Sequence, residues 1–346
     1  MSERALRVLM LAHNQAEVTV GAVRALLPQL AEGERLLLLD NASEPAQGRM
    51  LSLLAEENRD RIGFSHSPHN LGFAAGMNRL IAAALAEPSV QWLLLLNNDA
   101  VPAADSLRLL HEAAQRHGDQ AMVAAALMKW DDPAAVDSLG ITLYRSGLAS
   151  NRKHRQERLL GPTGGCMLLS RRLLEDLHAQ HGYWFDERFF CYAEDTDLVM
   201  RARWLGYDCV FADDAQALHH GSLSSGGPDN TFVLYHGIRN SIWALAKNAP
   251  ALWLLAHLPW MLVAHAGVCL RNLRKGRWRT LWRLYADAAR GLPAMWRERR
   301  TVRRSRRLPA RAWWRWVEPR LYERDYLRKA WRELWRRGGR AGHPDQ

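Results

Sequence analysis

The sequence predicts an α/β fold built on a mostly parallel sheet with helices on its faces. Short apolar runs of strand length recur along the first 130 residues, and they lack helical spacing. Segments with helical periodicity lie between them, and this alternation is typical of strand–helix–strand units. Three of the runs stop at polar groups: AHN at 12–14, DNAS at 40–43 and NNDA at 97–100. Because ligands bind beyond the carboxyl ends of such strands, these groups indicate one pocket.

The expected elements follow one another in chain order. Strands are expected near 7–12, 35–40, 61–66, 91–96 and 121–128, and helices over 16–31, 46–60, 73–86 and 104–117. The middle of the chain is less regular. It holds a Gly-rich segment at 161–165, an expected helix near 171–180, and an aromatic and acidic segment at 183–197. Functional sites often lie in such irregular stretches.

Charge is distributed very unevenly. Residues 271–346 carry a net charge of +17 and 8 of the 15 Trp, whereas residues 1–270 sum to −6. Arg combined with Trp is the composition of a surface that lies at a lipid headgroup layer. Nucleic acid is the alternative partner for such a region.

Residues 248–270 contain no Asp, Glu, Lys or Arg and are long enough to cross a membrane. Pro259 interrupts this segment, and His257, Met261 and His265 form a partly polar stripe at helical spacing. A single crossing would also separate the first part of the chain from the Arg-rich tail. We expect an interfacial or re-entrant helix, with a true span and packing against the globular part as the alternatives.

Several acidic and glycine residues have both a functional and a structural interpretation. Asp99, after an apolar run and two Asn, suits a hard cation that bridges diphosphate oxygens, or it forms an ordinary turn. Asp40 can accept a hydrogen bond from a ribose or a base, or it caps the next helix. Gly72 and Gly76 allow phosphate to approach a helix start, or they serve helix packing.

The densest group of carboxylates is Glu194, Asp195 and Asp197, beside several aromatic residues. Crowding and partial burial would raise at least one pKa toward the range of a general base. The alternative is that Glu194 or Asp195 simply begins the helix that carries Arg201 and Arg203.

Other potential metal ligands are few. His219 and His220 precede a Gly/Ser loop and are candidates, although a single His is usually structural. The four cysteines are far apart and form no CxxC motif, so neither a zinc cluster nor a disulfide framework is indicated. A reducing cytoplasm fits this usage, and the N-terminal run VLMLA is too short for a signal peptide.

Taken in order, the motifs resemble those of the family 2 inverting glycosyltransferases, specifically the bacterial rhamnosyltransferase-like branch. They are VLMLAHN, LLLLDNAS, NLGFAAGMN, LLLLNNDA, GPTGGCMLLSRR, FDERFFCYAEDTDLVMRARWLGY, LHHGSLSS and YHGIRNSIW, across about residues 6–245. The resemblance implies a GT-A fold, a nucleotide-diphosphate sugar donor and a divalent metal, Mg²⁺ or Mn²⁺.

The resemblance also implies roles for individual residues. Donor-binding positions are Asn14, Asp40, Asn41, Gly72, Asn78, Asn97, Asn98 and Asp99, and acceptor-binding positions are Gly164 and Gly165. Asp195 matches the acceptor-activating base, with Glu194 orienting the segment, and Asp99 and His219 match the metal ligands. His219 is preferred to His220 because its distance to Ser224 fits the family. Asn97 stands where the broader pattern often has Asp, so the metal would be held more weakly, and the resemblance leaves its requirement for catalysis open.

We therefore expect an enzyme that moves rhamnose or a similar sugar to a hydroxyl of a lipid-linked or cell-envelope saccharide. The alternatives are a nucleotidyltransferase, disfavoured because no Gly-rich, Lys-bearing loop follows the first strand, and a nucleic-acid-binding protein. The expected organisation is a GT-A domain at 1–240 and a basic, Trp-rich helical region at 241–346. This region would attach the protein peripherally to the inner face of the plasma membrane, without nucleic acid as a partner.

Overall fold

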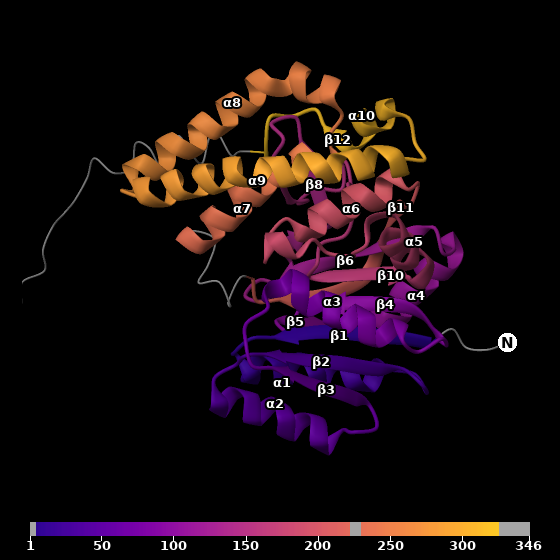
Figure 1. Ribbon diagram of the computed structural model, residues 1–346. Coiled ribbons are helices and arrows are strands. Elements are labelled where there is room, and N and C mark those ends of the chain that lie inside the picture. Colours follow the sequence, from indigo (N-terminus) through magenta and orange to yellow (C-terminus); the bar gives the residue numbers. More distant parts are fainter. Residues whose placement is uncertain (1–4, 222–229, 325–346) are drawn as a thin grey trace, which may run out of the picture.

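The computed structural model describes residues 5–221 and 230–324. Its main feature is a nine-stranded sheet in the order β3-β2-β1-β4-β10-β6-β11-β5, with β7 paired to β6 (Figure 1). The strands of this sheet are β1 (Ala5–Ala12), β2 (Arg35–Asn41), β3 (Ile62–Ser67), β4 (Val90–Leu96), β5 (Ala100–Pro102), β6 (Ala121–Lys129), β7 (Val136–Ser138), β10 (Cys166–Ser170) and β11 (Asp208–His219). A smaller sheet joins β12 (Val317–Glu318), β8 (Ile141–Tyr144) and β9 (Ala149–Asn151).

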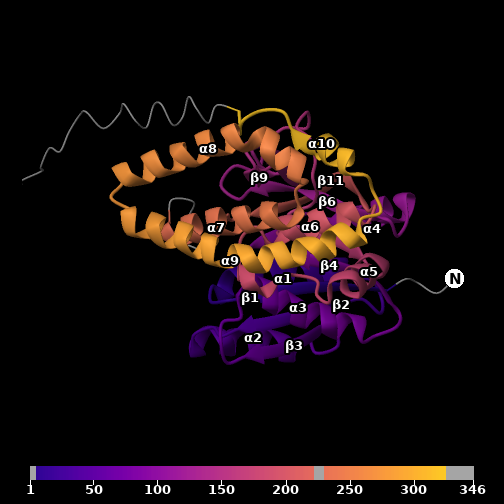
Figure 2. The ribbon, with the colours of Figure 1, turned by 45° about the horizontal axis from the view of Figure 1, so that its top comes forward.

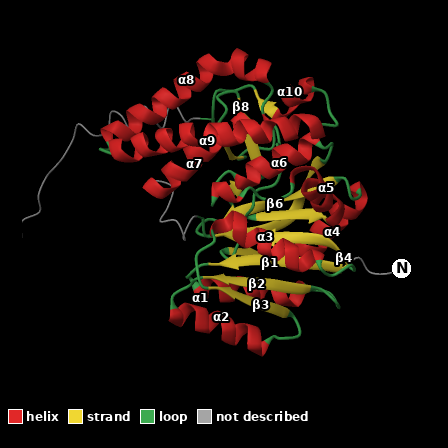
Figure 3. Cartoon of the chain, viewed as in Figure 1, coloured by secondary structure: helices red, strands yellow, loops and turns green. Residues whose placement is uncertain are grey.

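Helices lie along both sides of the main sheet and above one edge (Figure 3). They are α1 (Ala16–Leu26), α2 (Pro45–Glu57), α3 (Gly72–Leu85), α4 (Ser106–His117), α5 (Arg171–His181), α6 (Glu194–Trp204), α7 (Thr231–Asn248), α8 (Ala251–Arg274), α9 (Trp278–Ser305) and α10 (Trp313–Trp316). Short 3₁₀ turns are η1 (Leu27–Gln29), η2 (Glu187–Phe189) and η4 (Ala310–Ala312).

The sheet is buried on both faces, which explains why its strands read as continuous apolar runs. Leu93 and Leu95 of β4 belong to the core shared with α3, α5 and α6. Leu94 and Leu96 alternate to the other face, where they pack with α1 and α4. Because successive side chains of a strand point to opposite faces of the sheet, alternate residues of β4 pack into two separate hydrophobic cores.

The expected alternation of strands and helices over the first 130 residues is confirmed, with the helices starting or ending a few residues from the expected positions. The helix expected near 171–180 is α5. The strand β10 is a finding beyond these expectations. It inserts antiparallel between β4 and β6, and side-chain periodicity cannot reveal the direction or partners of a buried strand.

Helices α7, α8 and α9 lie together at one edge of the sheet, with α8 outermost (Figures 1 and 2). Trp253, Trp313 and Trp316 from this region belong to the same core cluster as Leu95 of the sheet. Strand β12 also pairs with β8. The boundary expected at residue 240 falls inside α7, and the division into two parts stays a prediction.

Helix α8 has two different faces. His257 stacks on Trp253 with ring centroids 4.5 Å apart, and Nδ1 of His265 lies 3.0 Å from the Tyr285 hydroxyl, so the partly polar stripe faces the protein. Leu252 and Leu255 on the outside are 77% and 69% exposed. Among residues 5–221 and 230–324, α8 is the one helix long and apolar enough to cross a membrane.

Candidate active site

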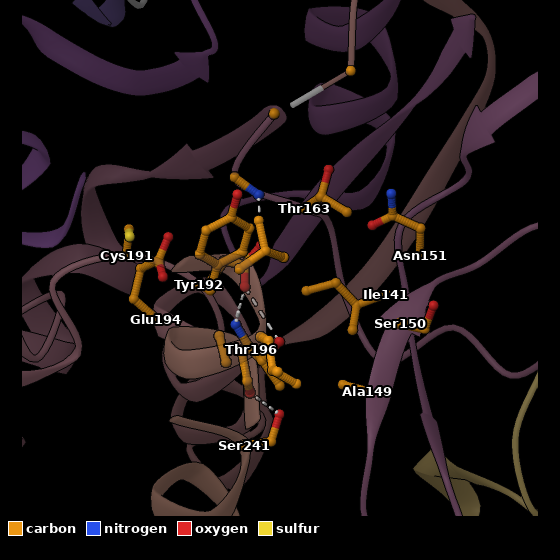
Figure 4. Close-up of a pocket in the computed structure, with 18 of the residues that line it drawn as sticks. Ile141, Ala149, Ser150, Asn151, Thr163, Cys191, Tyr192, Glu194, Thr196 and Ser241 are labelled. Carbon is orange, nitrogen blue, oxygen red and sulfur yellow. Dashed lines mark hydrogen bonds between the residues drawn. The ribbon is translucent and has the colours of Figure 1, made fainter. Parts of the chain in front are cut away.

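A cavity of about 1580 Å³ opens beyond the carboxyl ends of the parallel strands. Ten of the thirteen residues expected to form the site line this cavity. They are Asn41, Gly72, Asn97, Asn98, Asp99, Gly164, Gly165, Glu194, Asp195 and His219. Figure 4 shows Cys191, Tyr192 and Glu194 on one side, across from Ala149, Ser150 and Asn151 on the other. The convergence predicted from the strand ends is therefore observed for most of the set.

Asp99 and His219 meet because β5, which follows Asp99, pairs with β11. His219 stands opposite Ala100 in that pairing, and its Nε2 lies 3.2 Å from Oδ1 of Asp99. The other ring nitrogen, Nδ1, lies 2.7 Å from Oδ2 of Asp137 on β7. The imidazole thus bridges two carboxylates, and Asp137 is a site residue that no sequence signal had singled out.

The environment of His219 favours a charged ring. Burial lowers its pKa, but the hydrogen bonds that the ring donates to Asp137 and Asp99, together with the negative charges of these carboxylates, outweigh burial and raise the pKa to about 9. His220 also lines the cavity, but its ring stacks on Trp130 at 3.9 Å between centroids, and only its main-chain amide bonds to Asp99. Of the two histidines, His219 is the one whose ring lies beside Asp99.

A metal site is only partly assembled by protein atoms. No group of three or more His, Cys, Asp or Glu side chains that could hold a metal ion occurs within 5–221 and 230–324. Asp99 and His219 offer one carboxylate and one imidazole, and the buried Nε2 of His219 has no other hydrogen-bond partner. Such a pair could bind a divalent cation only together with oxygens from a ligand or water.

Asp195 lies in the first turn of α6. The residue that caps this helix is Ala193, which offers no side-chain cap, so neither Glu194 nor Asp195 serves as the N-cap. Oδ2 of Asp195 accepts a hydrogen bond from the Gly164 amide at 3.0 Å, and Oδ1 accepts one from the Thr196 amide at 2.6 Å. Burial nevertheless raises the pKa of Asp195.

The surroundings of Glu194 disfavour its charged form even more strongly. Burial, followed by the neighbouring charge of Asp195, raises its pKa well above the usual value. Its Oε2 is buried and makes no hydrogen bond. The two adjacent carboxyl groups therefore differ. Asp195 has amide donors on both oxygens, whereas Glu194, which also lines the cavity, has one buried oxygen without a hydrogen-bond partner.

The two glycines expected on the acceptor side join the two acidic parts of the site. Gly164 donates to Asp195, and the carbonyl of Gly165 accepts from the amide of Asn97 at 3.0 Å. A Cβ at Gly165 would stand 2.9 Å from a methyl of Leu127, so a larger residue would displace this contact. A contact of either glycine with an acceptor stays a prediction.

The loop that precedes α6 is strained. Phe190, Tyr192 and Ala193 all have positive φ, between 63° and 66°, which is unusual for residues with side chains. Asn240 of α7 holds this loop through its side-chain amide, which lies 2.9 Å from the Phe189 carbonyl and 2.7 Å from that of Tyr192. Asn240, which belongs to the motif YHGIRNSIW, therefore holds the loop before α6 in place. The sequence alone did not indicate this role.

The strand ends β1 and β2 form a separate polar group. Asp40 is buried, accepts from the Ser43 amide at 3.0 Å and lies 3.1 Å from Nδ1 of His66. Asn14 accepts from the Glu44 amide at 2.8 Å. Asp40 does not cap α2, whose N-cap is Glu44. Neither Asn14 nor Asp40 lines the cavity, and their contact with a nucleoside stays a prediction.

Three donor-side residues have structural partners. Asn41 accepts from the Leu71 amide at 2.8 Å, which fixes the loop before α3. Gly72 has φ +71°, and a Cβ there would come within 2.5 Å of the Phe190 ring. Asn78 lies on α3, away from the cavity lining, and its amide binds the main chain of Phe185 at both ends. A donor role for Asn78 is a prediction that the structure leaves untested.

A buried ionic network underlies α6. Lys247 of α7 lies 2.9 Å from Asp186 and 2.9 Å from Asp197, and Asp197 also pairs with Arg201 at 2.9 Å. Burial raises the pKa of Asp197, but Lys247 and Arg201 outweigh burial and hold it well below the usual value. Asp197 and Arg201 form an i, i+4 pair within α6. Lys247 could not be foreseen, because its partners are 50 or more residues away.

Comparison with known proteins gives the same picture as the motifs. Residues 7–178 match the family described as Glycosyl transferase family 2. An N-acetylglucosaminyl-diphospho-decaprenol L-rhamnosyltransferase of Mycobacterium tuberculosis is 29% identical over 219 residues, covering 56% of this chain and 69% of the relative.

Solved structures show the same fold at low identity. GalNAc-T7, solved with UDP, GalNAc and Mn²⁺, superposes with a TM-score of 0.58 and 14% identity over 76% of this chain and 51% of its own. Mannosyltransferase PcManGT from Pyrobaculum calidifontis, in complex with GDP-Man and Mn²⁺, gives 0.54 and 16% over 87% and 85%.

Proposed function

The chain is a glycosyltransferase of family 2 with a GT-A fold, and from this premise we propose that it transfers L-rhamnose or a similar sugar from a nucleoside-diphosphate donor to a hydroxyl of a lipid-linked saccharide. One observation carries the proposal. Asp99 and Asp195, a buried carboxylate at a strand end and another at a helix start, line one cavity and are joined through consecutive glycines. The family match does not favour a nucleotidyltransferase or a nucleic-acid-binding protein.

The donor would lie across the ends of β1, β2 and β4. Asn14, Asp40 and Asn41 would contact the nucleoside, and Gly72 would let the backbone approach the donor. Asn97, Asn98 and Asp99 would face the diphosphate. Support comes from the position of these residues at the carboxyl edge of the parallel strands, where such sheets bind nucleotides.

Asp99 and His219 would hold a divalent cation, Mg²⁺ or Mn²⁺. Nε2 of His219, whose one partner among the described residues is the Asp99 carboxylate at 3.2 Å, fits this assignment, and Asp137 on the opposite ring nitrogen would fix the ring. When bound, the cation would neutralise charge on the departing diphosphate. With only two protein ligands, we expect weak binding in the absence of a nucleotide.

Asp195 would act as the base. Its carboxylate would take the proton from the acceptor hydroxyl while that oxygen attacks the anomeric carbon from the side opposite the diphosphate, which inverts the configuration. The Gly164 and Thr196 amides hold the carboxylate in one orientation, and burial keeps it poorly solvated and thus more basic. Glu194 would orient this segment.

The acceptor and the location follow from the relative and from the C-terminal helices. The relative's name gives a diphospho-decaprenol acceptor, and a similar acceptor here would lie in a membrane. The exposed leucines of α8 and the exposed Trp282 of α9 stand in a region that carries most of the chain's positive charge. This combination suits the anionic inner face of the plasma membrane, with 1–240 as catalytic domain and 241–346 as membrane-associated region.

The test is a transfer assay with purified full-length protein in mixed micelles. Nucleoside-diphosphate sugars, including L-rhamnose donors, are offered with polyprenyl-diphospho-N-acetylglucosamine, and the product linkage is read by NMR. We expect one donor to give an inverted glycosidic bond. Absence of transfer and of donor hydrolysis with every nucleotide sugar would contradict the proposal.

A further inference from the structure

One wall of the active-site cavity is formed by the small sheet. Ile141 of β8 stands opposite Asn151 of β9 in their antiparallel pairing, and on its other side the Ile141 amide donates to the Gly161 carbonyl at 2.7 Å. Residues directly opposed in an antiparallel pair place their side chains on the same face of a sheet. Ile141 and Asn151 both line the cavity, and Figure 4 shows them across from Glu194. This face of the sheet is therefore turned toward the site.

The chain runs from this wall directly to the proposed base. Thr163, which follows the segment that bridges to β8, also lines the cavity. The next residue, Gly164, donates its amide to Oδ2 of Asp195 at 3.0 Å. A Cβ built at Gly164 would stand 3.7 Å from the Cβ of Asp195. Thr163, Ile141 and Asn151 thus form a rim of the cavity that begins beside Asp195, and we call these three residues the polar rim.

Two side chains of the polar rim have hydrogen-bonding capacity that the protein does not use. No described residue hydrogen-bonds to the hydroxyl of Thr163 or to the side-chain amide of Asn151. Asn151 is exposed and Thr163 is half-buried, so both can be reached from the cavity. By contrast, the Ser241 hydroxyl, which also lines the cavity, donates to the Gly237 carbonyl at 2.7 Å. The polar rim therefore offers donors and acceptors to a ligand.

Residues near the C-terminal end of the described chain support this wall. Strand β12 pairs with β8, and the Ser150 hydroxyl of β9 donates to the Glu323 carboxylate. The ring of Tyr322 packs on that of Tyr144 in β8, with 5.2 Å between centroids. The strand that carries Asn151 is therefore held by β8 on one side and by Glu323 on the other. A binding side chain on such a supported strand keeps one orientation.

We propose that Thr163 and Asn151 bind the acceptor sugar, a neutral pyranose ring whose apolar face lies over Ile141. Sugar hydroxyl groups both donate and accept hydrogen bonds, as do the hydroxyl and the amide of the polar rim. The rim carries no charge, and Glu323 beside β9 would repel an acidic sugar. The attacking hydroxyl would lie at the Asp195 end of the rim. The inference rests on the proposed function and adds the side chains that recognise the acceptor sugar.

The experiment measures binding of two probes to the full-length protein by calorimetry in detergent: undecyl-diphospho-N-acetylglucosamine, and undecyl diphosphate, which lacks the sugar. Thr163→Val keeps the branched shape but removes the hydroxyl, and Asn151→Ala removes the amide. Each should raise the Kd of the sugar-bearing probe about 3- to 10-fold and leave that of undecyl diphosphate unchanged. In the transfer assay the acceptor KM should rise by a similar factor while kcat is retained. Thr163→Ser keeps the hydroxyl and should bind like the wild type.

The matched control is Ser241→Ala, which removes a hydroxyl of the cavity lining that is already bonded to the Gly237 carbonyl. It should leave the Kd of both probes unchanged. Equal losses for both probes in Thr163→Val and Asn151→Ala would indicate a general disturbance of the cavity and would overturn the subsite, as would no loss for either. A loss confined to dTDP-L-rhamnose would mean that the polar rim contacts the transferred sugar, and the acceptor assignment would be wrong.

The subsite and the proposed function can fail separately. If the wild type glycosylates the sugar-bearing probe and Thr163→Val and Asn151→Ala keep its KM, the subsite is wrong and the function stands. If the sugar-bearing probe binds through Thr163 and Asn151 but no nucleotide sugar glycosylates it, the subsite stands and the proposed transfer is wrong. If the wild type binds both probes with the same Kd, the sugar makes no contact with the polar rim and the subsite is wrong.

Discussion

Asp195 and Glu194 are adjacent carboxyl groups with different surroundings, and this difference can be tested residue by residue. Asp195→Asn keeps the size of the side chain but cannot take a proton, so turnover should fall by roughly 10²–10⁴ while donor Kd is retained. In Glu194→Gln the new side chain resembles the neutral acid that burial favours, so turnover should fall far less than in Asp195→Asn. Turnover, donor Kd and thermal midpoint are measured on the same samples. Near-normal turnover of Asp195→Asn would exclude it as the base.

The pH profile gives a second check on Asp195. Its folded pKa is raised by burial, and a base works only when deprotonated. Activity should therefore be lost on acidification at a pH above the ordinary value of about 3.9 for an aspartate. An acid limb of kcat/KM at or below that value would argue against a buried carboxylate as the base.

Asp137 should act through His219 by fixing which ring nitrogen faces Asp99. Asp137→Ala removes the carboxylate that binds Nδ1, and loss of such a partner typically weakens metal binding 10–100-fold. The Kd of Mn²⁺, measured by electron paramagnetic resonance with UDP present, is the readout. Asp131→Ala, which removes another acid of the cavity lining, is the control and should change it little. Similar Kd values for both variants would show that Asp137 does not position His219.

At the scale of elements, α7 stabilises α6 through the buried Lys247. Lys247→Met should lower the free energy of unfolding by about 3–5 kcal/mol, because Asp186 and Asp197 lose a buried partner. Urea denaturation measures the change. Arg108→Met, which breaks an exposed ion pair with Glu112, is the control and should lower the free energy of unfolding far less than Lys247→Met. Equal stability of the Lys247 variant and the wild type would contradict this role.

The same network predicts the acid stability of the α6–α7 pair. Lys247 and its neighbours hold the folded pKa of Asp197 and Asp186 below the usual value, despite burial that raises it. A lowered pKa contributes stability above the unfolded value of about 3.9, and this contribution is lost as the pH falls toward the folded pKa. In Lys247→Met the folded pKa values should rise, so acid unfolding should begin at a higher pH than in the wild type.

At the scale of the whole molecule, the outer face of α8 should bind membranes. Leu252→Gln, Leu255→Gln and Leu262→Gln together change exposed side chains, so the fold should persist while binding to phosphatidylglycerol vesicles weakens at least about tenfold. Sedimentation with vesicles at physiological salt measures it. Leu53→Gln changes a leucine on α2 that is 52% exposed and should have no effect. Unchanged binding of the triple variant would rule out α8 as the docking face.

Truncation is a poor substitute for these substitutions. A chain that ends near Ser241 would be cut inside α7 and would lack Lys247. It would also lose Trp253 and Trp313, which are fully buried in the main core. Its loss of membrane binding would therefore be confounded by unfolding.

The sequence by itself determined the first sheet strands, their helices and most of the site. Apolar runs of strand length that stop at polar residues are local patterns. Because the carboxyl ends of parallel strands lie at one edge of a sheet, these patterns also predicted that Asn41, Asp99 and their neighbours share one site. The acidic segment that runs into the first turn of α6 was recognisable from its crowded carboxylates and aromatic neighbours. These signals lie within a few residues of one another along the chain.

Only the tertiary structure decided which distant groups meet. The antiparallel β10 joins β4 to β6, Asp137 reaches His219 across 82 residues, and Lys247 reaches Asp186 across 61. Arg277 returns to Asn272 because of one left-handed glycine. Sequence periodicity records whether a side chain is buried. It does not record its partner, because a buried charge depends on whichever opposite charge the packed elements bring within hydrogen-bond distance.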